Sequence, residues 1–176
     1  LNTDQIAVLS SAQLNSIDAA DWATLSSDQI RAINTSALAG LDATRISNLT
    51  SDQVQALTTD QVKALTSTEL HNLTASQVKS LTTDQINALS ATQVPGIDSA
   101  DLVQMSTEQI VAINTAAVSG LSSAQVNQLT TDQIQALTTE QVAKLTTAQI
   151  VALSSTQTPK LSAQQITALS TTQVSN

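Results

Sequence analysis

The sequence predicts an all-α solenoid of very short capped helices, with one helix for each repeat of eight residues. The 176 residues divide into 22 octads without an insertion or deletion. Each octad begins with Leu, Ile or Met, and its second residue is always Asn, Ser, Asp or Thr. Tandem repeats of this kind are typical of solenoids, in which each unit buries its apolar side against its neighbours. We therefore expect residues 1–176 to form one uninterrupted domain.

The second position of the octad predicts where each helix begins. Asn, Ser, Asp and Thr are the residue types that most often cap a helix N-terminus. Three residues later, position five is Gln or Glu in 17 octads, which completes the pattern of a capping box. A new helix is thus expected every eight residues, within positions three to eight, and most helices should have about four to six residues.

The charged residues support the same helix boundaries. All fourteen acidic residues fall at positions two, four or five, near the expected helix start. Five of the six basic residues fall at positions seven or eight, near the expected helix end. The helix dipole favours this distribution. Arg45, at position five, is the exception.

Positions six and one are expected to form the core. Position six is apolar in every octad except at Thr158, and position one of the next octad follows three residues later, on the same helical face. Position eight is Ala in eight octads and Gly in three, which favours close approach between coils. Because so short a helix is unstable alone, its stability must come from stacked neighbours. We expect about two to three octads per coil, of either hand.

Two other architectures, a coiled coil and a β-solenoid, fit the same octads less well. One continuous helix would carry the apolar stripe around the rod by about 80° per octad, so no coiled-coil partner could bury it. A β-solenoid also uses short repeats. However, positions one and six cannot share one face of an unbroken strand, and three glycines are few for its many tight corners. Short capped helices fit better.

Five residues depart from the repeat and have individual interpretations. Trp22 occupies position six and is interpreted as an oversized core residue, and Met105 occupies position one and is also assigned to the core. His71 lies at position seven and is expected to be a solvated surface residue. Pro95 and Pro159, both at position seven, should end their helices early, because proline lacks the N–H that a helix needs.

A longer period is superimposed on the octads. The octads Ile17–Thr24 and Ile33–Gly40 recur 80 residues later as Ile97–Gln104 and Ile113–Gly120, with the same departures from the consensus. We interpret this as duplication of a block of ten octads.

The composition argues against several classes of function. The chain has no Cys and one His, so thiolate chemistry and most His-based metal centres are excluded. Six basic and fourteen acidic residues give a net charge of −8, which disfavours binding to nucleic acid or to an anionic membrane surface. No apolar run is long enough for membrane insertion. We predict no catalytic, cofactor-binding or metal site, no cofactor, and no enzyme activity.

The octad Leu-Thr-Thr-Asp-Gln-Val/Ile-x-Ala is found at Leu57–Ala64, Leu81–Ala88 and Leu129–Ala136. It resembles the octapeptide arrays of very large repetitive bacterial proteins, which are described as secreted or adhesin-like and are sometimes labelled haem-utilisation or RTX-type proteins. The resemblance covers the whole chain but carries no functional residues. It implies a stalk or filament-forming region at the bacterial cell surface or outside the cell.

These observations lead to two functional hypotheses. The first is a structural, extracellular stalk or filament element that self-associates end to end, with contacts to a cell or solid surface made by other parts of the full-length protein. The terminal octads follow the same rule as the middle, and Leu1, Ile6, Leu169 and Val174 are expected to leave apolar edges at both ends. The alternative is a binding module that adsorbs to ice or another surface through its regular Ser and Thr hydroxyls.

Overall fold

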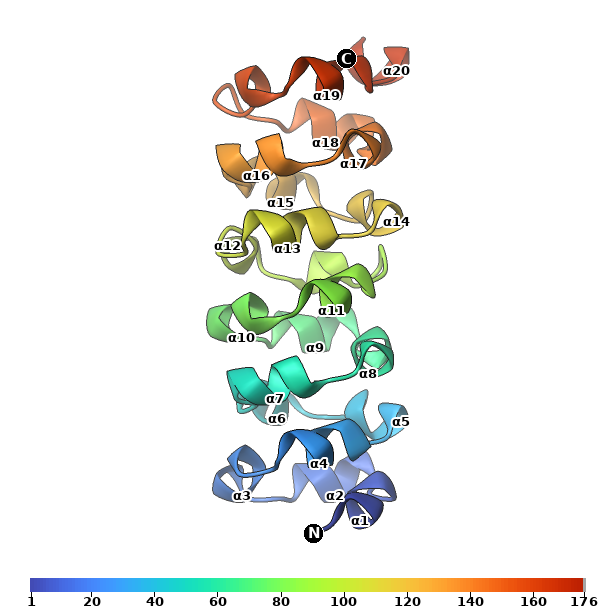
Figure 1. Ribbon diagram of the computed structural model, residues 1–176, viewed down its shortest axis with the longest axis vertical. Coiled ribbons are helices and arrows are strands. Elements are labelled where there is room, and N and C mark those ends of the chain that lie inside the picture. Colours follow the sequence, from blue (N-terminus) through green and yellow to red (C-terminus); the bar gives the residue numbers. More distant parts are fainter. Residues whose placement is uncertain (176) are drawn as a thin grey trace.

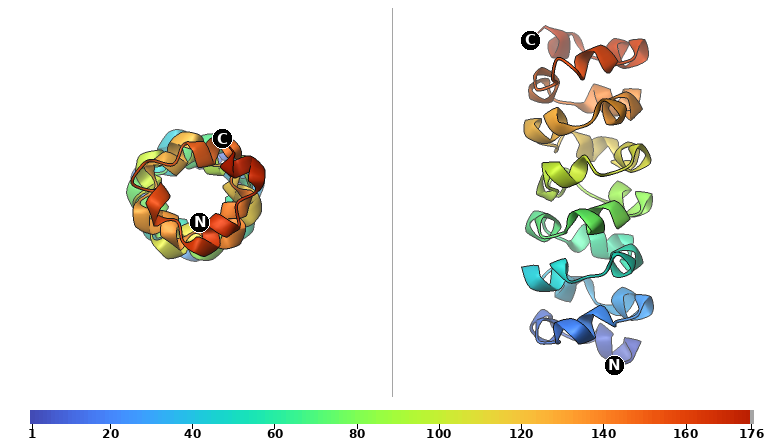
Figure 2. Two further views of the ribbon diagram at one scale, coloured as in Figure 1. Left: turned by 90° about the horizontal axis from the view of Figure 1, so that it is seen from above. Right: turned by 90° about the vertical axis from the view of Figure 1, so that its left-hand side faces the viewer.

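The computed structural model describes residues 1–175, which wind into a rod of stacked coils (Figure 1). As the chain rises from its N-terminus, it crosses the front of the rod from left to right and returns behind, so the coil is right-handed. Viewed along the rod axis, the coils superpose as a ring (Figure 2). The described residues form helices and turns without a strand. The predicted all-α solenoid is confirmed.

Every α-helix begins at position three of its octad and has four to six residues, as predicted. The helices in chain order are α1 (Thr3–Ala7), α2 (Ser11–Asn15), α3 (Ala19–Ala23), α4 (Ser27–Ala32), α5 (Thr35–Leu38), α6 (Ala43–Ser47), α7 (Ser51–Ala56), α8 (Thr59–Ala64), α9 (Ser67–His71), α10 (Ala75–Ser80), α11 (Thr83–Asn87), η1 (Val94–Gly96), α12 (Ser99–Leu102), α13 (Thr107–Ala112), α14 (Thr115–Val118), α15 (Ser123–Gln128), α16 (Thr131–Ala136), α17 (Thr139–Lys144), α18 (Thr147–Val151), η2 (Thr158–Lys160), α19 (Ala163–Thr167) and α20 (Thr171–Val174).

The predicted caps are present at most helix starts. In α10, for example, the Thr74 side chain accepts from the backbone N–H of Gln77, and the Gln77 side chain accepts from the backbone N–H of Thr74. Of the described α-helices, only α3 and α12 lack a side-chain cap. Both of these begin after an Asp, Asp18 or Asp98.

The two prolines change the helix type of their octads. Pro95 and Pro159 lie in the three-residue 3-10 helices η1 and η2, in octads that form no α-helix. Proline at position seven removes the N–H that would bond to the carbonyl of position three and crowds that carbonyl. The chain therefore forms a turn followed by a tighter 3-10 helix at positions six to eight. The prediction that these prolines end α-helices early is wrong, because no α-helix forms in their octads.

One coil contains more octads than the two to three expected. Most helices contact the helix three octads away, as α4 contacts α1 and α7 contacts α4. The hydrogen bonds between neighbouring coils join residues 25 to 31 positions apart, so the ring closes after more than three octads and fewer than four. Most octads turn two apolar side chains inward, and we attribute the larger ring to the volume of these close-packed side chains.

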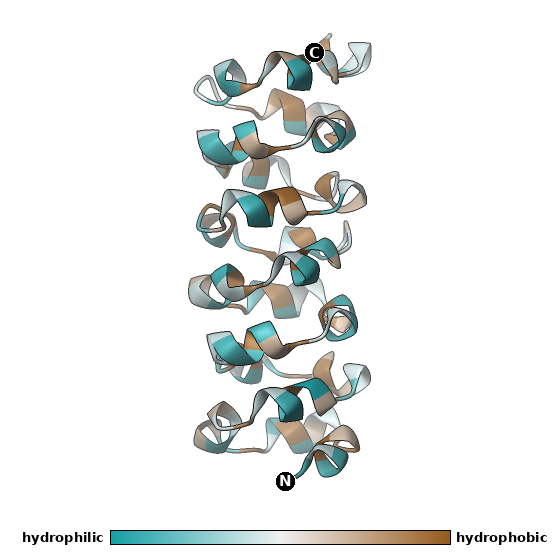
Figure 3. Ribbon diagram, viewed as in Figure 1, coloured by the Kyte–Doolittle hydropathy of each residue, from teal (hydrophilic) through white to brown (hydrophobic). Residues whose placement is uncertain are grey.

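The core runs along the rod axis and is built from positions one and six, as predicted. Trp22 is fully buried at position six, and its indole Nε1 donates to the carbonyl oxygen of Arg45 at 3.1 Å. Met105 is also buried in the core. Each coil carries both hydrophobic and hydrophilic segments, as the colouring in Figure 3 shows. The alternation allows one chain to form both the core and the wetted surface.

Position eight is where adjacent coils come closest. A Cβ atom at Gly120 would lie 2.0 Å from the carbonyl oxygen of Ala91, and one at Gly96 would lie 2.2 Å from that of Ser67. None of the described glycines has a positive φ angle. These glycines are therefore required by the close approach of another backbone and not by an unusual backbone conformation.

Candidate functional site: the contacts between coils

The glutamine at position five uses both ends of its side-chain amide. In α10, Gln77 Oε1 accepts from the backbone N–H of Thr74 at 2.7 Å, which is the capping contact. Its Nε2 donates to the carbonyl oxygens of Ile46 at 2.8 Å and Leu49 at 2.7 Å, in the preceding coil. Gln77 is buried. One amide thus starts a helix and fastens that helix to the coil below.

The same bridge recurs along the rod. The glutamines at position five that donate from Nε2 to carbonyl oxygens of the preceding coil are Gln29, Gln53, Gln61, Gln77, Gln85, Gln93, Gln109, Gln125, Gln133, Gln141, Gln149, Gln157, Gln165 and Gln173. In most of them the accepting residues lie 28 and 31 positions earlier. Gln5 and Gln13 lie in the first coil and make the capping contact alone.

In two octads without this glutamine, an asparagine at position two supplies the donor. Where position five is Ala37, the side chain of Asn34 at position two caps the helix and donates from Nδ2 to the carbonyl oxygens of Ala7 and Leu9. Asn114 makes the equivalent contacts: its Oδ1 accepts from the backbone N–H of Ala117, and its Nδ2 donates to the carbonyl oxygens of Asn87 and Leu89. The contact between coils is therefore conserved in chemistry although the donating position changes.

Arg45, the basic residue that departs from the predicted charge pattern, belongs to the same system. Its guanidinium Nη2 donates to the carbonyl oxygens of Asn15, at 2.9 Å, and of Ile17. Ile17 lies 28 residues before Arg45, the spacing that most glutamines use. Arg45 therefore replaces a position-five amide as the donor to the coil below.

Glu69 keeps the cap but lacks the donor. Its Oε2 accepts from the backbone N–H of Thr66 at 2.6 Å. Its Oε1 is buried and has no hydrogen-bond partner, at the place where a glutamine would carry its NH₂ group. In most other octads the amide nitrogen at this place donates to carbonyl oxygens 31 and 28 residues earlier, which for Glu69 are those of Leu38 and Leu41. A carboxylate oxygen and a carbonyl oxygen are both acceptors, so no hydrogen bond can form between them. We call the recurring hydrogen bonds from position-five glutamines to the preceding coil the amide ladder. At the octad of Glu69 this ladder lacks its hydrogen bonds.

The octads that contain paired aspartates differ again. Asp98 does not cap α12; instead its Oδ1 lies 2.8 Å from Nδ1 of His71, in the preceding coil. Burial and the Asp98 carboxylate raise the pKa of Asp101, and His71 acts in the opposite direction. His71 is largely exposed, as predicted, but its contact with Asp98 was not foreseen. These side chains form a surface contact between coils.

The two end faces of the rod are chemically different, because the side chain at position five packs against the preceding coil and the side chain at position six is covered by the next coil. At the N-terminal end Ile6 is fully buried, whereas Gln5 is exposed. At the C-terminal end Val174 is 64% exposed, whereas Gln173 is buried. The expectation that Ile6 leaves an apolar edge at the N-terminal end is therefore wrong, because the next coil covers position six. Leu1 and Val8, 66% and 80% exposed, are the exposed large apolar residues of the first octad.

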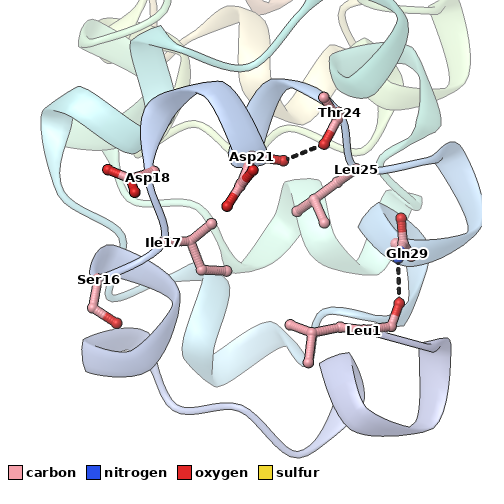
Figure 4. A pocket seen from close by; sticks show the side chains of 8 residues that line it. All are labelled: Leu1, Ser16, Ile17, Asp18, Asp21, Thr24, Leu25 and Gln29. Atoms are coloured by element: carbon pink, nitrogen blue, oxygen red, sulfur yellow. Dashed lines mark hydrogen bonds between the residues drawn. The ribbon is translucent and has the colours of Figure 1, made fainter.

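A depression lies near the N-terminal end of the rod (Figure 4). It has a volume of about 490 Å³, and its lining includes Leu1, Asp18, Asp21 and Gln29. Across it the Gln29 amide donates to the carbonyl oxygen of Leu1. The hydroxyls of Ser16 and Thr24, which also line it, donate to carbonyl oxygens three residues earlier in their own octads. Residues 1–175 contain no group of three or more His, Cys, Asp or Glu side chains placed to hold a metal ion.

The contacts between coils are the feature that sequence reasoning missed. The capping pattern accounts for Gln at position five, so nothing in a single octad demanded a second role for the amide. A signal was present in Ile33–Gly40 and Ile113–Gly120, where Asn at position two accompanies Ala at position five. That paired change indicates that one amide has replaced another.

The class of protein follows from this geometry: it is a right-handed α-solenoid of tandem octads, in which a recurring side-chain amide contact joins successive coils. The sequence model of the ALTTAQ repeat matches residues 38–67, 94–131, 120–147 and 128–162, which together cover more than half of the chain. The chain therefore belongs to the ALTTAQ repeat family. No curated protein matches the sequence. None of the helices in the described part is long and apolar enough to cross a membrane.

Proposed function

We propose that this chain is a structural rod, a stalk or filament-forming segment of a large bacterial protein at the cell surface or outside the cell. The observation that carries the proposal is the amide ladder. The same Gln contact joins each coil to the one before it, from Gln29 to Gln173. An array of this kind lengthens by adding octads without a change in the interface, which suits a spacer.

The rod gains stability from its neighbours and not from any single octad. Helices of four to six residues do not persist alone in water. Here most helices are stabilised by a cap and by the apolar core, and those away from the two ends of the rod also by the coils above and below them. Stability in such arrays grows with the number of repeats. Because stability grows with repeat number, octads can be added to such a rod without loss of the fold, which suits a stalk.

Length is the direct test of a rod. With about 28 residues per coil and about 10 Å between packed helices, repeating the block 17–96 once more should lengthen the rod by about 30 Å at constant thickness. Small-angle X-ray scattering of the 176-residue chain and of this longer variant measures both quantities. A longer variant that is more compact or globular would overturn the proposal.

The cellular setting is tested separately. Brief protease treatment of intact cells that produce the full-length protein should remove the array while cytoplasmic proteins stay intact. Protection of the array until the cells are lysed would overturn the extracellular part of the proposal.

The alternative, adsorption to ice or another regular surface, has less support. The hydroxyls at position two accept from backbone N–H groups in the caps, as Thr74 and Thr82 do. The rod is round in cross-section (Figure 2). Because a coil does not hold a whole number of octads, equivalent hydroxyls of adjacent coils are offset around the rod. Absence of thermal hysteresis and of ice shaping would remove this alternative.

A further inference from the structure

We propose that the carboxylate of Glu69 and the backbone carbonyl oxygens of Leu38 and Leu41 bind a small monovalent cation, of the class of Na⁺, between two coils of the rod. This inference does not depend on the function as a stalk, and its failure would leave the rod proposal unchanged.

Glu69 is a buried acidic residue whose charge has no partner in the chain. It is only 5% exposed, and its Oε1 makes no hydrogen bond. None of the ion pairs within residues 1–175 includes Glu69. Burial of a carboxylate without a counter-charge is strongly unfavourable. A positive charge bound beside Oε1 would therefore stabilise the folded chain.

The octads that meet at this place contain two basic side chains, and both face other groups. Arg45, in the octad that begins at Leu41, donates to carbonyl oxygens of the coil below. His71, in the same octad as Glu69, has its Nδ1 2.8 Å from Oδ1 of Asp98. The octad 33–40 has no charged residue. The chain thus supplies no cation of its own to Glu69.

The two carbonyl oxygens beneath Glu69 belong to a pair that converges on one atom elsewhere in the rod. In the preceding octad, Gln61 Nε2 lies 2.8 Å from each of two carbonyl oxygens, 31 and 28 residues earlier. Leu38 and Leu41 occupy the corresponding positions six and one below Glu69. Two carbonyl oxygens that share one nitrogen atom are also placed to share one cation.

The oxygens at this place are free to accept a further ligand. Leu38 O accepts from the backbone N–H of Leu41 at 3.1 Å, which leaves one of its two lone pairs. Within residues 1–175, no donor bonds to the Leu41 carbonyl oxygen. Glu69 Oε2 accepts from the backbone N–H of Thr66, so the cap does not require Oε1. Three oxygen atoms without a donor between them suit a hard cation, which takes oxygen ligands.

The charge at this place favours a monovalent ion. Glu69 supplies one negative charge, so a singly charged ion makes the buried group neutral. A divalent ion would leave one positive charge uncompensated between the coils, which is unfavourable. Ca²⁺ also takes about six to eight oxygen ligands, and this place offers one carboxylate and two carbonyl groups.

The experiment measures the stability of the 176-residue chain as a function of Na⁺ concentration. Ionic strength is kept constant with tetramethylammonium chloride, whose bulky cation does not fit between the coils. Above the dissociation constant, each tenfold increase in Na⁺ should raise the folding equilibrium constant about tenfold, since one ion binds the folded chain alone. Stability that does not respond to Na⁺ would overturn the proposal.

Glu69→Gln removes the charge and restores the amide. In tetramethylammonium chloride alone this variant should be the more stable chain, and the difference from the unmodified chain should narrow as Na⁺ is added. The matched control Glu140→Gln removes a carboxylate at an exposed position four and should keep the Na⁺ response. An equal response of the unmodified chain and of Glu69→Gln would overturn the assignment to this place.

The same group of oxygens can be created at a second place. Gln77→Glu puts a carboxylate above the carbonyl oxygens of Ile46 and Leu49. This variant should bind two ions, so each tenfold increase in Na⁺ should raise its folding equilibrium constant about a hundredfold. Gln55→Glu, at an exposed position seven, should keep the response of one ion. A folded Gln77→Glu chain that binds no second ion would overturn the carbonyl pair as the binding element.

NMR relaxation of the sodium ion measures binding directly and should be faster with the unmodified chain than with Glu69→Gln. Two results would replace the proposed ion by another. Stabilisation at acidic pH without a response to Na⁺ would mean that the carboxyl group takes up a proton instead. Tighter binding of Ca²⁺ than of Na⁺ would contradict the charge argument. Either result overturns the monovalent metal ion as the ligand.

Discussion

The Nε2 group of Gln77 donates to the carbonyl oxygen of Leu49 at 2.7 Å, across the boundary between two coils and 28 residues apart in sequence. The same glutamine accepts from Thr74 three residues earlier. A local contact that starts a helix and a distant one that stacks it therefore depend on a single side chain.

The first prediction concerns this double role. Gln77→Met keeps the length of the side chain but removes the cap contact and the bonds to Ile46 and Leu49, whose buried carbonyls lose a donor. We expect the free energy of unfolding to fall by about 1–3 kcal/mol. Urea denaturation followed by circular dichroism measures the loss. Gln55→Met, at an exposed position seven, is the control and should change stability little; equal losses would contradict the role given to the amide.

Glu69 provides the reverse experiment. Glu69→Gln replaces the buried, unpartnered Oε1 by an NH₂ group that can donate to the carbonyls of the preceding coil. We expect the variant to be more stable by about 1–3 kcal/mol. Glu140→Gln, at an exposed position four, removes the same charge without the bridge and should have little effect on the unfolding midpoint. A destabilised Glu69→Gln variant would mean that the carboxylate has a partner of its own.

The caps are tested by Thr130→Ala and Thr138→Ala, which remove hydroxyls that accept from the backbone N–H groups of Gln133 and Gln141. Each change should cost about 1 kcal/mol. Thr139→Ala, one residue past the cap and exposed, should be neutral or slightly stabilising, because Ala favours helices. Thermal unfolding of the three variants decides the matter, and equal stabilities would show that the hydroxyls do not start the helices.

The close approach of coils predicts a difference between two glycines. In Gly120→Ala the new methyl group would meet the backbone carbonyl of Ala91 at 2.0 Å, and neither backbone can move without disturbing its coil. We expect a loss of about 1–3 kcal/mol or more. In Gly40→Ala the nearest atoms are Ser11 Cβ at 2.7 Å and Ser11 Oγ at 2.8 Å, so the contact is less close than at Gly120, and rotation of the Ser11 side chain moves Oγ away. The smaller loss expected for Gly40→Ala is measured in the same denaturation series.

The sequence by itself determined where helices begin, how long they are and which residues form the core. These properties depend on residues a few positions apart: the cap joins Thr74 to Gln77, and proline at position 95 acts on its own octad. Interactions of such short range are repeated in every octad and do not depend on how the coils are arranged.

The tertiary structure alone decided the hand of the coil, the number of octads in it and the second role of the position-five amide. Each depends on where the ring closes, which is set by the packing of side chains from several octads around one axis. Gln77 meets Leu49, and Asn34 meets Leu9, only because the ring closes near 28 residues. This spacing of about 28 residues is longer than one octad and is not a whole number of octads, so the contacts between coils could be identified only from the tertiary structure.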